Sequence, residues 1–272
     1  MPGHFNNHDS EDGVFDRTMT CYSQGDAVRT STRKSWRYAV AAVAVVAAFV
    51  TSVSLAFADE DVFSPESRPF DKPFKEWSAE WWQFVLSIPT TVNPLLDQSG
   101  QDCMVGQHGP VWFLVGTFGQ PTAVRICSIP AGKALFFPIV NSVNFDTRNA
   151  CGQRSEPLLV RDLRAASAAF ADGATNLAVD IDGERIKQLQ HRFRVRSAVF
   201  ELTVPADNLF NPFCPNGLPA RTYFPAVDDG FYVMLKPLEV GTHTLHLHGE
   251  VPSQGFSVDV TYYLNIVPLS LR

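Results

Sequence analysis

From residue 110 onward, the chain consists mainly of short segments that are rich in Val, Ile and aromatic residues and separated by Gly and Pro. Segments of this kind are typical of β-strands. The clearest examples are 110–117, 123–130, 134–141, 230–238, 242–249 and 256–268. The pattern predicts a mainly β protein, a β-sandwich of the Ig-like or jelly-roll-like kind.

Two segments have helical rather than strand periodicity. In residues 73–88, Phe74, Trp77 and Trp81 recur at helical spacing, and Pro89 ends the pattern. A second helix is expected from a cap at 155–157 to about Asp172, ended by Gly173. We therefore expect a sandwich with an N-terminal helix and one inserted helix.

The adjacent indoles of Trp81 and Trp82 have two interpretations. They could form a sugar-stacking platform, or they could belong to the face that packs the helix onto a sheet. Aromatic residues at helical spacing more often belong to such a packing face, and we favour that interpretation.

Further elements are expected between residues 176 and 222. Residues 176–182 with the turn at Asp182-Gly183 predict a hairpin. Residues 191–197 alternate as a strand, and the apolar phase slips near Ser197, which indicates a bulge. Residues 205–222 are rich in Pro and Asn and are expected to form a loop.

The N-terminal 58 residues resemble an export signal rather than part of the domain. Residues 1–35 are polar and lack apolar periodicity, while 36–58 contain the uncharged run 38–57 and end in Ala56-Phe57-Ala58. A basic flank, an apolar run and an A-x-A site predict a cleaved signal peptide. An uncleaved membrane anchor is the alternative. A Pro-rich lead (59–72) and one domain (73–272) complete the organisation.

Four cysteines lie beyond the signal: Cys103, Cys127, Cys151 and Cys214. An even number in an exported chain predicts disulfides, and four cysteines allow three pairings. We expect Cys103–Cys127, because these two flank a strand and its hairpin return, and therefore Cys151–Cys214. A zinc site is the rival interpretation, but no C-x-x-C spacing is present.

The net charge of −6 argues against nucleic acid as a partner. A membrane is expected to contact the chain only through its N-terminal segment. The predicted location is periplasmic or extracellular, or membrane-anchored if residues 38–57 are retained.

Two stretches resemble known proteins. WFLVGTFG…RICSIPAGKALFFPIVN (112–141) followed by DDGFYVMLKPLEVGTHTLHLHG (228–249) resembles a set of exported bacterial proteins of unassigned function, over most of residues 73–268. That resemblance implies no activity. Separately, Leu238, Gly241, His243, Thr244 and Leu245 are similar to the closing hairpin of Ig-like sandwich modules, where the segment is a folding feature.

The segment THTLHLHG (242–249) is the first candidate site. Residues two apart on a strand share a face, so His246 and His248 lie side by side while His243 points with Leu245 toward the core. Two imidazoles on one face are a start for Zn²⁺ or Cu²⁺, but a catalytic site needs a third protein ligand. The third ligand could be His108, His191, Asp146, Asp228 or Asp229, and nothing in the spacing selects among them. The candidate metal set is therefore His246 and His248 with His108 or an acidic residue. The alternative is a pair of exposed strand histidines, with no cofactor.

Two further segments are candidates for ligand binding. The polar stretch 141–154 contains Asn141, Asn144 and Asp146 and is tied down by Cys151, which suits a ligand site, although such turns are common without one. Arg192, Arg194 and Arg196 would form a cationic strip for an acidic glycan if they share a strand face. Solvated or paired charges, for example Asp180 with Arg185, are the usual explanation.

No G-x-S-x-G motif and no Gly-rich phosphate loop is present. We therefore expect an exported, disulfide-stabilised protein that binds a cell-envelope glycan or protein without chemistry. The alternative is a metal-dependent exported hydrolase or oxidase that uses the histidines.

Overall fold

A computed structural model describes residues 61–118 and 120–269, all within one compact unit. The predicted polar segment 1–35 and the signal or anchor at 36–58 lie outside the described residues. Among the described residues, no helix has the length and apolarity needed to span a membrane.

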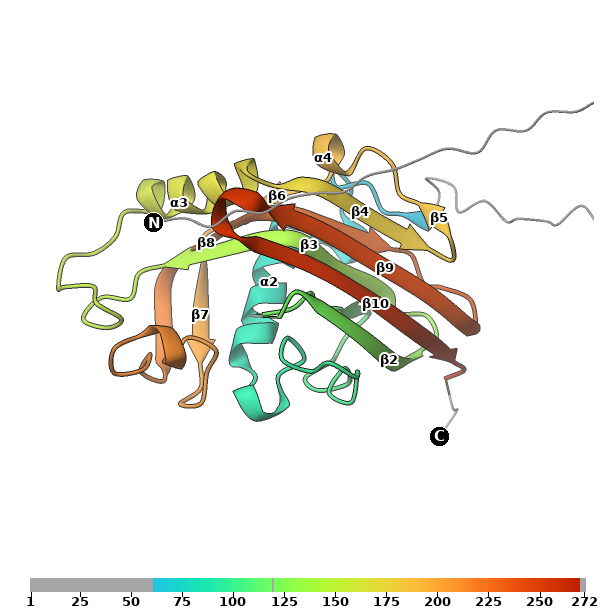
Figure 1. The fold of residues 1–272 in the computed structure, drawn as a ribbon, viewed down its shortest axis with the longest axis horizontal. Helices are drawn as coiled ribbons and strands as arrows, with labels where there is room; N and C mark the ends of the chain where they lie inside the picture. Colours follow the sequence, from blue (N-terminus) through green and yellow to red (C-terminus); the bar gives the residue numbers. More distant parts are fainter. Residues whose placement is uncertain (1–60, 119, 270–272) are drawn as a thin grey trace, which may run out of the picture. The chain divides into compact units, whose positions relative to one another are not determined.

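The described chain folds mainly as strands, with α-helices and single 3₁₀ turns between them (Figure 1). The helices are α2 (Phe74–Ser87), α3 (Val160–Asp172) and α4 (Leu189–Arg192). The 3₁₀ turns are η2 (Pro69–Asp71), η3 (Thr90–Val92), η4 (Asn211–Phe213) and η5 (Pro252–Gln254). The strands are β1 (Val111–Phe113), β2 (Thr122–Pro130), β3 (Ala134–Phe145), β4 (Thr175–Ile181), β5 (Glu184–Arg185), β6 (Arg194–Arg196), β7 (Phe200–Val204), β8 (Arg221–Leu235), β9 (Gly241–Val251) and β10 (Phe256–Val267).

The strands form two sheets, which confirms the predicted sandwich class. Sheet A has the order β1-β3-β8-β6, with β7 also paired to β8, and sheet B has the order β2-β10-β9-β4-β5. The pairs β1–β3 and β2–β10 are parallel, and the others are antiparallel. Side chains such as Phe137 and Val233 of sheet A and Leu247 and Leu264 of sheet B share one core between the sheets.

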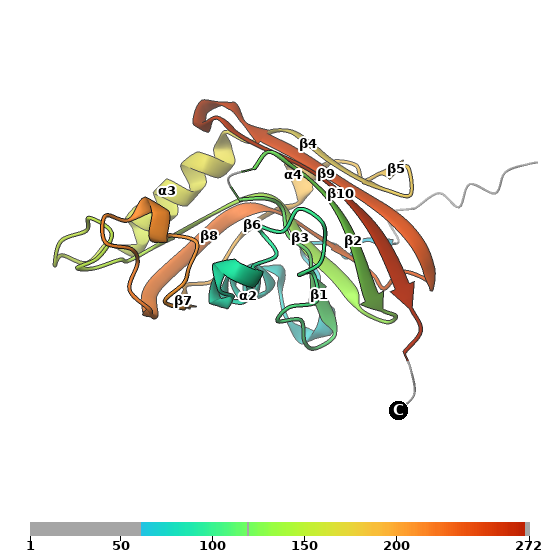
Figure 2. The same ribbon diagram turned by 60° about the horizontal axis from the view of Figure 1, so that its bottom comes forward.

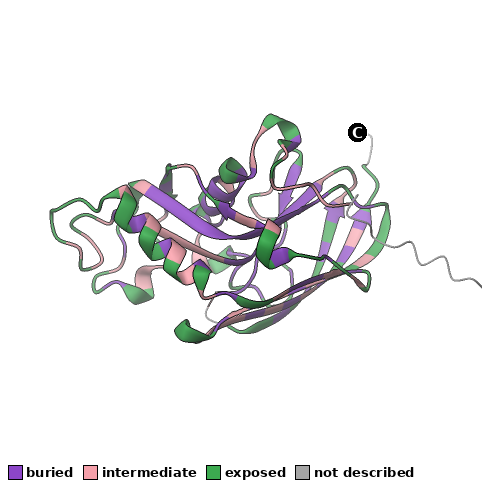
Figure 3. Cartoon of the chain, turned by 90° about the horizontal axis from the view of Figure 1, so that it is seen from above, coloured by how far each residue is buried: buried purple, intermediate pink, exposed green. Residues whose placement is uncertain are grey.

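Sheet A is buried on both faces, because α2 packs on the face that points away from sheet B (Figure 2). Phe136, Tyr232 and Met234 point toward α2 and contribute to a second core with Trp77 and Trp81. Strands buried on both faces are apolar throughout, which explains the unbroken apolar run in β3. By contrast, β2 and β9 alternate between buried and exposed residues. Figure 3 shows the buried residues concentrated in the strands.

Several predicted boundaries are wrong for identifiable reasons. The expected strand 110–117 is only Val111–Phe113, since the chain then leaves sheet A and crosses to sheet B. The expected loop 205–222 ends where the long strand β8 begins at Arg221. The expected strand 191–197 is split between the end of α4 and β6. The predicted interruption near Ser197 is present: β6 and β7 both pair with β8, and the chain between them leaves the sheet pairing.

Both disulfide pairings are confirmed. Cys103 and Cys127 lie 6.0 Å apart between Cα atoms, and Cys151 and Cys214 lie 4.4 Å apart. The reason given for the first pairing is wrong, however, because β1 and β2 belong to different sheets. This bridge instead ties the loop before β1 to the edge strand β2. The chemistry of the pairs suits an oxidising compartment.

Candidate functional site

The predicted histidine pair lies on one face of β9, and both imidazoles contact the same carboxylate. One carboxylate oxygen of Asp259 on β10 lies 3.1 Å from His246 Nε2, and the other lies 3.1 Å from His248 Nδ1. Asp180 and Glu250 flank the pair at 3.7 and 3.3 Å. Across residues 61–118 and 120–269, no group of three or more His, Cys, Asp or Glu side chains is arranged to hold a metal ion.

Two further histidines, His243 and His108, lie at turns. His243 lies 2.7 Å from Asp182 and 3.0 Å from the carbonyl of Glu239, so it joins the β4–β5 turn to the turn before β9. Its place beside the leucines near the edge of the core is as predicted. His108 is exposed and its Nδ1 lies 3.0 Å from the carbonyl oxygen of Gly106.

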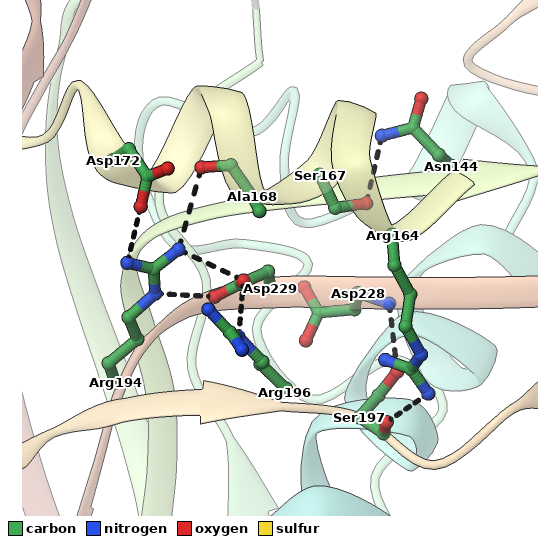
Figure 4. Close-up of polar contacts among 10 residues, drawn as sticks. All are labelled: Asn144, Arg164, Ser167, Ala168, Asp172, Arg194, Arg196, Ser197, Asp228 and Asp229. Carbon is green, nitrogen blue, oxygen red and sulfur yellow. Dashed lines mark hydrogen bonds and ion pairs between the residues drawn. The ribbon is translucent and has the colours of Figure 1, made fainter. Parts of the chain in front are cut away.

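The predicted arginine strip is neutralised, and one member is misplaced. Arg194 and Arg196 both bind Asp229, and Arg194 also binds Asp172 of α3 at 2.6 Å (Figure 4). The hydrogen bonds to Asp229 raise the pKa of Arg194 above its ordinary value, and they outweigh the opposite effect of burial. Arg192 ends α4 and is not on a strand face, because the chain coils at residues 189–192 before β6 begins. Asp180 pairs with Arg185, as expected.

Two residues of the predicted polar stretch stabilise the protein's own loops. Asn144 lies within β3 and donates to the Ser167 hydroxyl of α3 at 2.9 Å (Figure 4). Asp146 is buried and binds Arg148 and Gln153. Burial alone would raise the pKa of Asp146, but these hydrogen bonds outweigh it and lower the pKa below its ordinary value.

Asn141, the third residue of that stretch, lines an aromatic pocket of about 340 Å³. Its aromatic walls come from α2 (Trp81, Trp82), from the segment after β1 (Phe118), from α3 (Phe170), from β10 (Phe256) and from the segment before β8 (Phe210, Phe213). Leu86, Leu95, Val143 and Leu209 add apolar surface, and Thr117, Asn141 and Ser142 are its polar members. A volume in this range is typical of small-molecule sites, which are roughly 300–1,000 Å³.

The pocket exists because β3 extends beyond its neighbour. β1 pairs only with residues 134–136, so within the described residues the edge of β3 from Pro138 onward has no adjacent strand. Helices α2 and α3 pack on opposite faces of sheet A at this place (Figures 1 and 2). The pocket therefore wraps around an open sheet edge and is bounded from both faces.

Aromatic contacts and a disulfide stabilise the walls of the aromatic pocket. Phe118 meets Phe213 edge to face at 5.7 Å between ring centroids, and Phe170 meets Phe256 at 5.4 Å. The Cys151–Cys214 bridge anchors the segment that carries Phe213, the residue next to Cys214. Trp81 is buried with its Nε1 donating to the Leu114 carbonyl at 2.8 Å, which confirms that this indole packs the helix onto the sheet.

A buried hydrogen-bond chain lies behind the polar wall. Asn141 Nδ2 donates to the Tyr232 hydroxyl at 2.9 Å, and that hydroxyl donates to Asp228 Oδ1 at 2.8 Å. Trp82 Nε1 donates to the same carboxyl oxygen at 2.8 Å. Trp82 and Asn141 face the pocket, whereas Asp228 and Tyr232 are fully buried beyond them.

Asp228 is neutral near pH 7. Burial raises its pKa from 3.8 to about 8, hydrogen bonds from Trp82, Tyr232 and Ser78 offset part of the effect, and the charge of Asp229 adds to it. Burial also raises the pKa of Tyr232 well above its ordinary value, so the phenol keeps its proton. No hydrogen bond of ordinary geometry reaches Asp228 Oδ2 from the part of the chain that is described.

Arg125 positions the wall that contains Thr117. It is buried, and it donates to the carbonyls of Asp97, Val115 and Gly116 at 2.8–2.9 Å and to the hydroxyl of Tyr262 at 2.7 Å. This guanidinium joins the segment between the sheets to the loop before β1. Thr117 follows directly, and its buried Oγ1 has no hydrogen-bond partner among the described residues.

Sequence reasoning identified Asn141, Trp81 and Trp82 as candidates for binding, but not as members of one site. Asp228 and Asp229 were considered only as metal ligands. A signal was present: two acidic residues inside a strongly apolar strand, 223–235, imply that at least one is buried and partnered. A second hollow, about 440 Å³, is lined by 176–177 and 185–190 without aromatic side chains. It offers less to a ligand than the aromatic pocket.

Neither protein-family models nor curated proteins give a match to this chain.

Proposed function

We propose that this protein is an exported binding protein that holds a small, mainly apolar molecule in the aromatic pocket. The observation that carries the proposal is the pocket itself: about 340 Å³, bounded by seven aromatic side chains, with three polar residues in its lining. Sites for small molecules combine an apolar lining with a few placed polar groups. The two disulfides support export to an oxidising compartment.

The composition of the pocket favours an apolar ligand over the cell-envelope glycan expected from the sequence. A sugar ring presents many hydroxyl groups, and each one that loses water needs a new hydrogen bond. The described lining offers only Thr117, Asn141 and Ser142 for this purpose. An aromatic or aliphatic body with few polar groups matches it better.

The test compares two Val→Phe variants on strands. Val143 lines the pocket and Val124 lies 58% exposed on β2, outside the pocket. Calorimetric titration with 2-naphthol and 2-methoxynaphthalene should show binding to the parent protein. V143F should weaken it at least about tenfold by filling the space, and V124F should leave it unchanged. Absence of binding to the parent, or equal binding by both variants, would contradict the proposal.

A further inference from the structure

The hydrogen bonds of the polar wall all run toward Asp228 Oδ1, with the proton of the neutral acid on Oδ2. Trp82 Nε1–H can only donate, and the Tyr232 hydroxyl donates to the same oxygen of Asp228. Having donated its proton, the Tyr232 oxygen accepts from Asn141 Nδ2. The direction of this chain orients the Asn141 amide, since only its NH₂ group can donate.

The consequence appears at the pocket surface. With Nδ2 committed to Tyr232, Asn141 Oδ1 receives no hydrogen bond from the described residues. It is a carbonyl acceptor on a residue that lines the cavity. Thr117 is also a lining residue, but its unpartnered Oγ1 is buried and closed to a ligand in the cavity. An acceptor that loses water on binding needs a new hydrogen bond, so Asn141 Oδ1 indicates what a ligand would supply.

The absence of charge in the described lining restricts the class of ligand further. None of the described lining residues carries a charge, so a carboxylate or phosphate would enter an apolar space without a cation. The nearest acid, Asp228, lies behind Trp82 and Tyr232 and is neutral near pH 7 because burial raises its pKa. A ligand cation therefore also lacks a counter-charge. A neutral group that donates to Asn141 Oδ1 satisfies this acceptor.

We propose that the ligand is an uncharged, hydroxyl-bearing apolar molecule of the phenol or alcohol class, with its hydroxyl group donating to Asn141 Oδ1. This proposal rests on the proposed binding function of the aromatic pocket and specifies its ligand. The pocket then selects for a donor hydroxyl rather than for an ether or an acid.

The experiment uses three probes with one ring system: 2-naphthol, 2-methoxynaphthalene and 2-naphthoate at pH 7. The protein, with both disulfides intact, is titrated calorimetrically with each probe. The naphthol should bind about 5- to 15-fold more tightly than the ether, as expected for one buried hydrogen bond, and the carboxylate should bind most weakly.

Two substitutions locate the effect. N141L should remove the preference for the naphthol while leaving ether binding within about twofold, because only the donor–acceptor contact is lost. N265L, on the outer side of β10 and outside the pocket, is the matched control and should retain the preference. If N141L fails to fold, the comparison of the three probes on the parent protein still tests the proposal.

The outcomes separate the two proposals. Equal affinity for naphthol and ether, or tightest binding of the carboxylate, would overturn the ligand class while leaving the pocket function intact. A preference for the naphthol that survives N141L would also overturn it. If none of the three probes binds the parent protein, the proposed function fails as well.

Discussion

Asp228 and Asp229 are consecutive on β8, yet their carboxyl groups lie on opposite faces of sheet A and are stabilised in opposite ways. Asp229 is held as a carboxylate by Arg194 and Arg196. Asp228 pairs with no arginine among the described residues. Trp82, Tyr232 and apolar side chains surround it, and burial raises its pKa to about 8, so it is neutral near pH 7. Strand geometry alone separates them, since successive side chains point to opposite faces.

The raised pKa of Asp228 predicts a specific pH dependence of stability. In the unfolded chain this group has a pKa near 4, and in the folded protein near 8. Between these values the folded state binds more protons than the unfolded state, so the free energy of unfolding falls as pH rises from about 4 to 8. The loss should be on the order of 2–4 kcal/mol, measured by urea denaturation at pH 5 and pH 8.

The matched variant for that measurement is D228N, which resembles the neutral acid and retains an oxygen acceptor for Trp82 and Tyr232. Its stability should change less between pH 5 and pH 8 than that of the parent, and it should be the more stable of the two at pH 8. An identical pH dependence in both proteins would mean that Asp228 is ionised throughout.

Replacing Arg125 should destabilise the protein even though Arg125 forms no ion pair among the described contacts. R125M leaves the buried carbonyls of Asp97, Val115 and Gly116 without a donor, which should cost about 3–5 kcal/mol in free energy of unfolding. R161M is the control, because Arg161 is 80% exposed and should contribute less than about 0.5 kcal/mol. Chemical denaturation measures both. Similar losses in the two variants would contradict the anchoring role.

Any substitution of Gly100 should destabilise the protein, both because a side chain has no space there and because the backbone conformation favours glycine. It has φ +93°, and an added Cβ would lie 2.7 Å from Ile126 N on the edge strand β2. Gly132 has φ +82° with nothing within 4 Å of an added Cβ. G132A should cost about 1 kcal/mol from backbone strain alone, and G100A should cost at least about 2 kcal/mol more. Equal thermal shifts would show that the loop moves freely away from β2.

The two disulfides should differ in their effect on ligand binding. Loop-closure entropy predicts a loss of stability of about 3 kcal/mol for C103A/C127A and about 4 kcal/mol for C151A/C214A. Only the second bridge anchors the segment with Phe210 and Phe213, so its removal should weaken binding to the aromatic pocket more strongly. Calorimetric titration of both double variants below their melting temperatures tests this, and equal affinities would contradict it.

The sequence predicted elements whose signals are local. Alternation predicted β9 and β10, apolar spacing predicted α2 and strand parity placed His246 beside His248. It failed where partners far apart in the chain decide the outcome. The crossing after Phe113 depends on Arg125 and Tyr262, and the length of β8 depends on β3, β6 and β7 pairing with it.

The pocket illustrates the same limit. Its walls come from residues 81–86, 95, 117–118, 141–143, 170, 209–213 and 256, and no spacing in the sequence connects them. Individual members were noticed, but the shared cavity depends on β3 extending past β1. Arg194 and Arg196 were expected to face a ligand and instead bind Asp229, because the sequence could not show that β6 pairs beside that residue.

The parallel pairing of β2 with β10 has a kinetic consequence. Thr122–Pro130 can be completed as a sheet strand only by Phe256–Val267, more than a hundred residues later. Until that segment arrives, β2 offers an unpaired backbone edge, and the core between the sheets lacks one of its sides. Such long-range pairing slows folding, because the intervening chain must be ordered first. The protein should therefore acquire its structure late and nearly all at once, when its final strand joins the sheet.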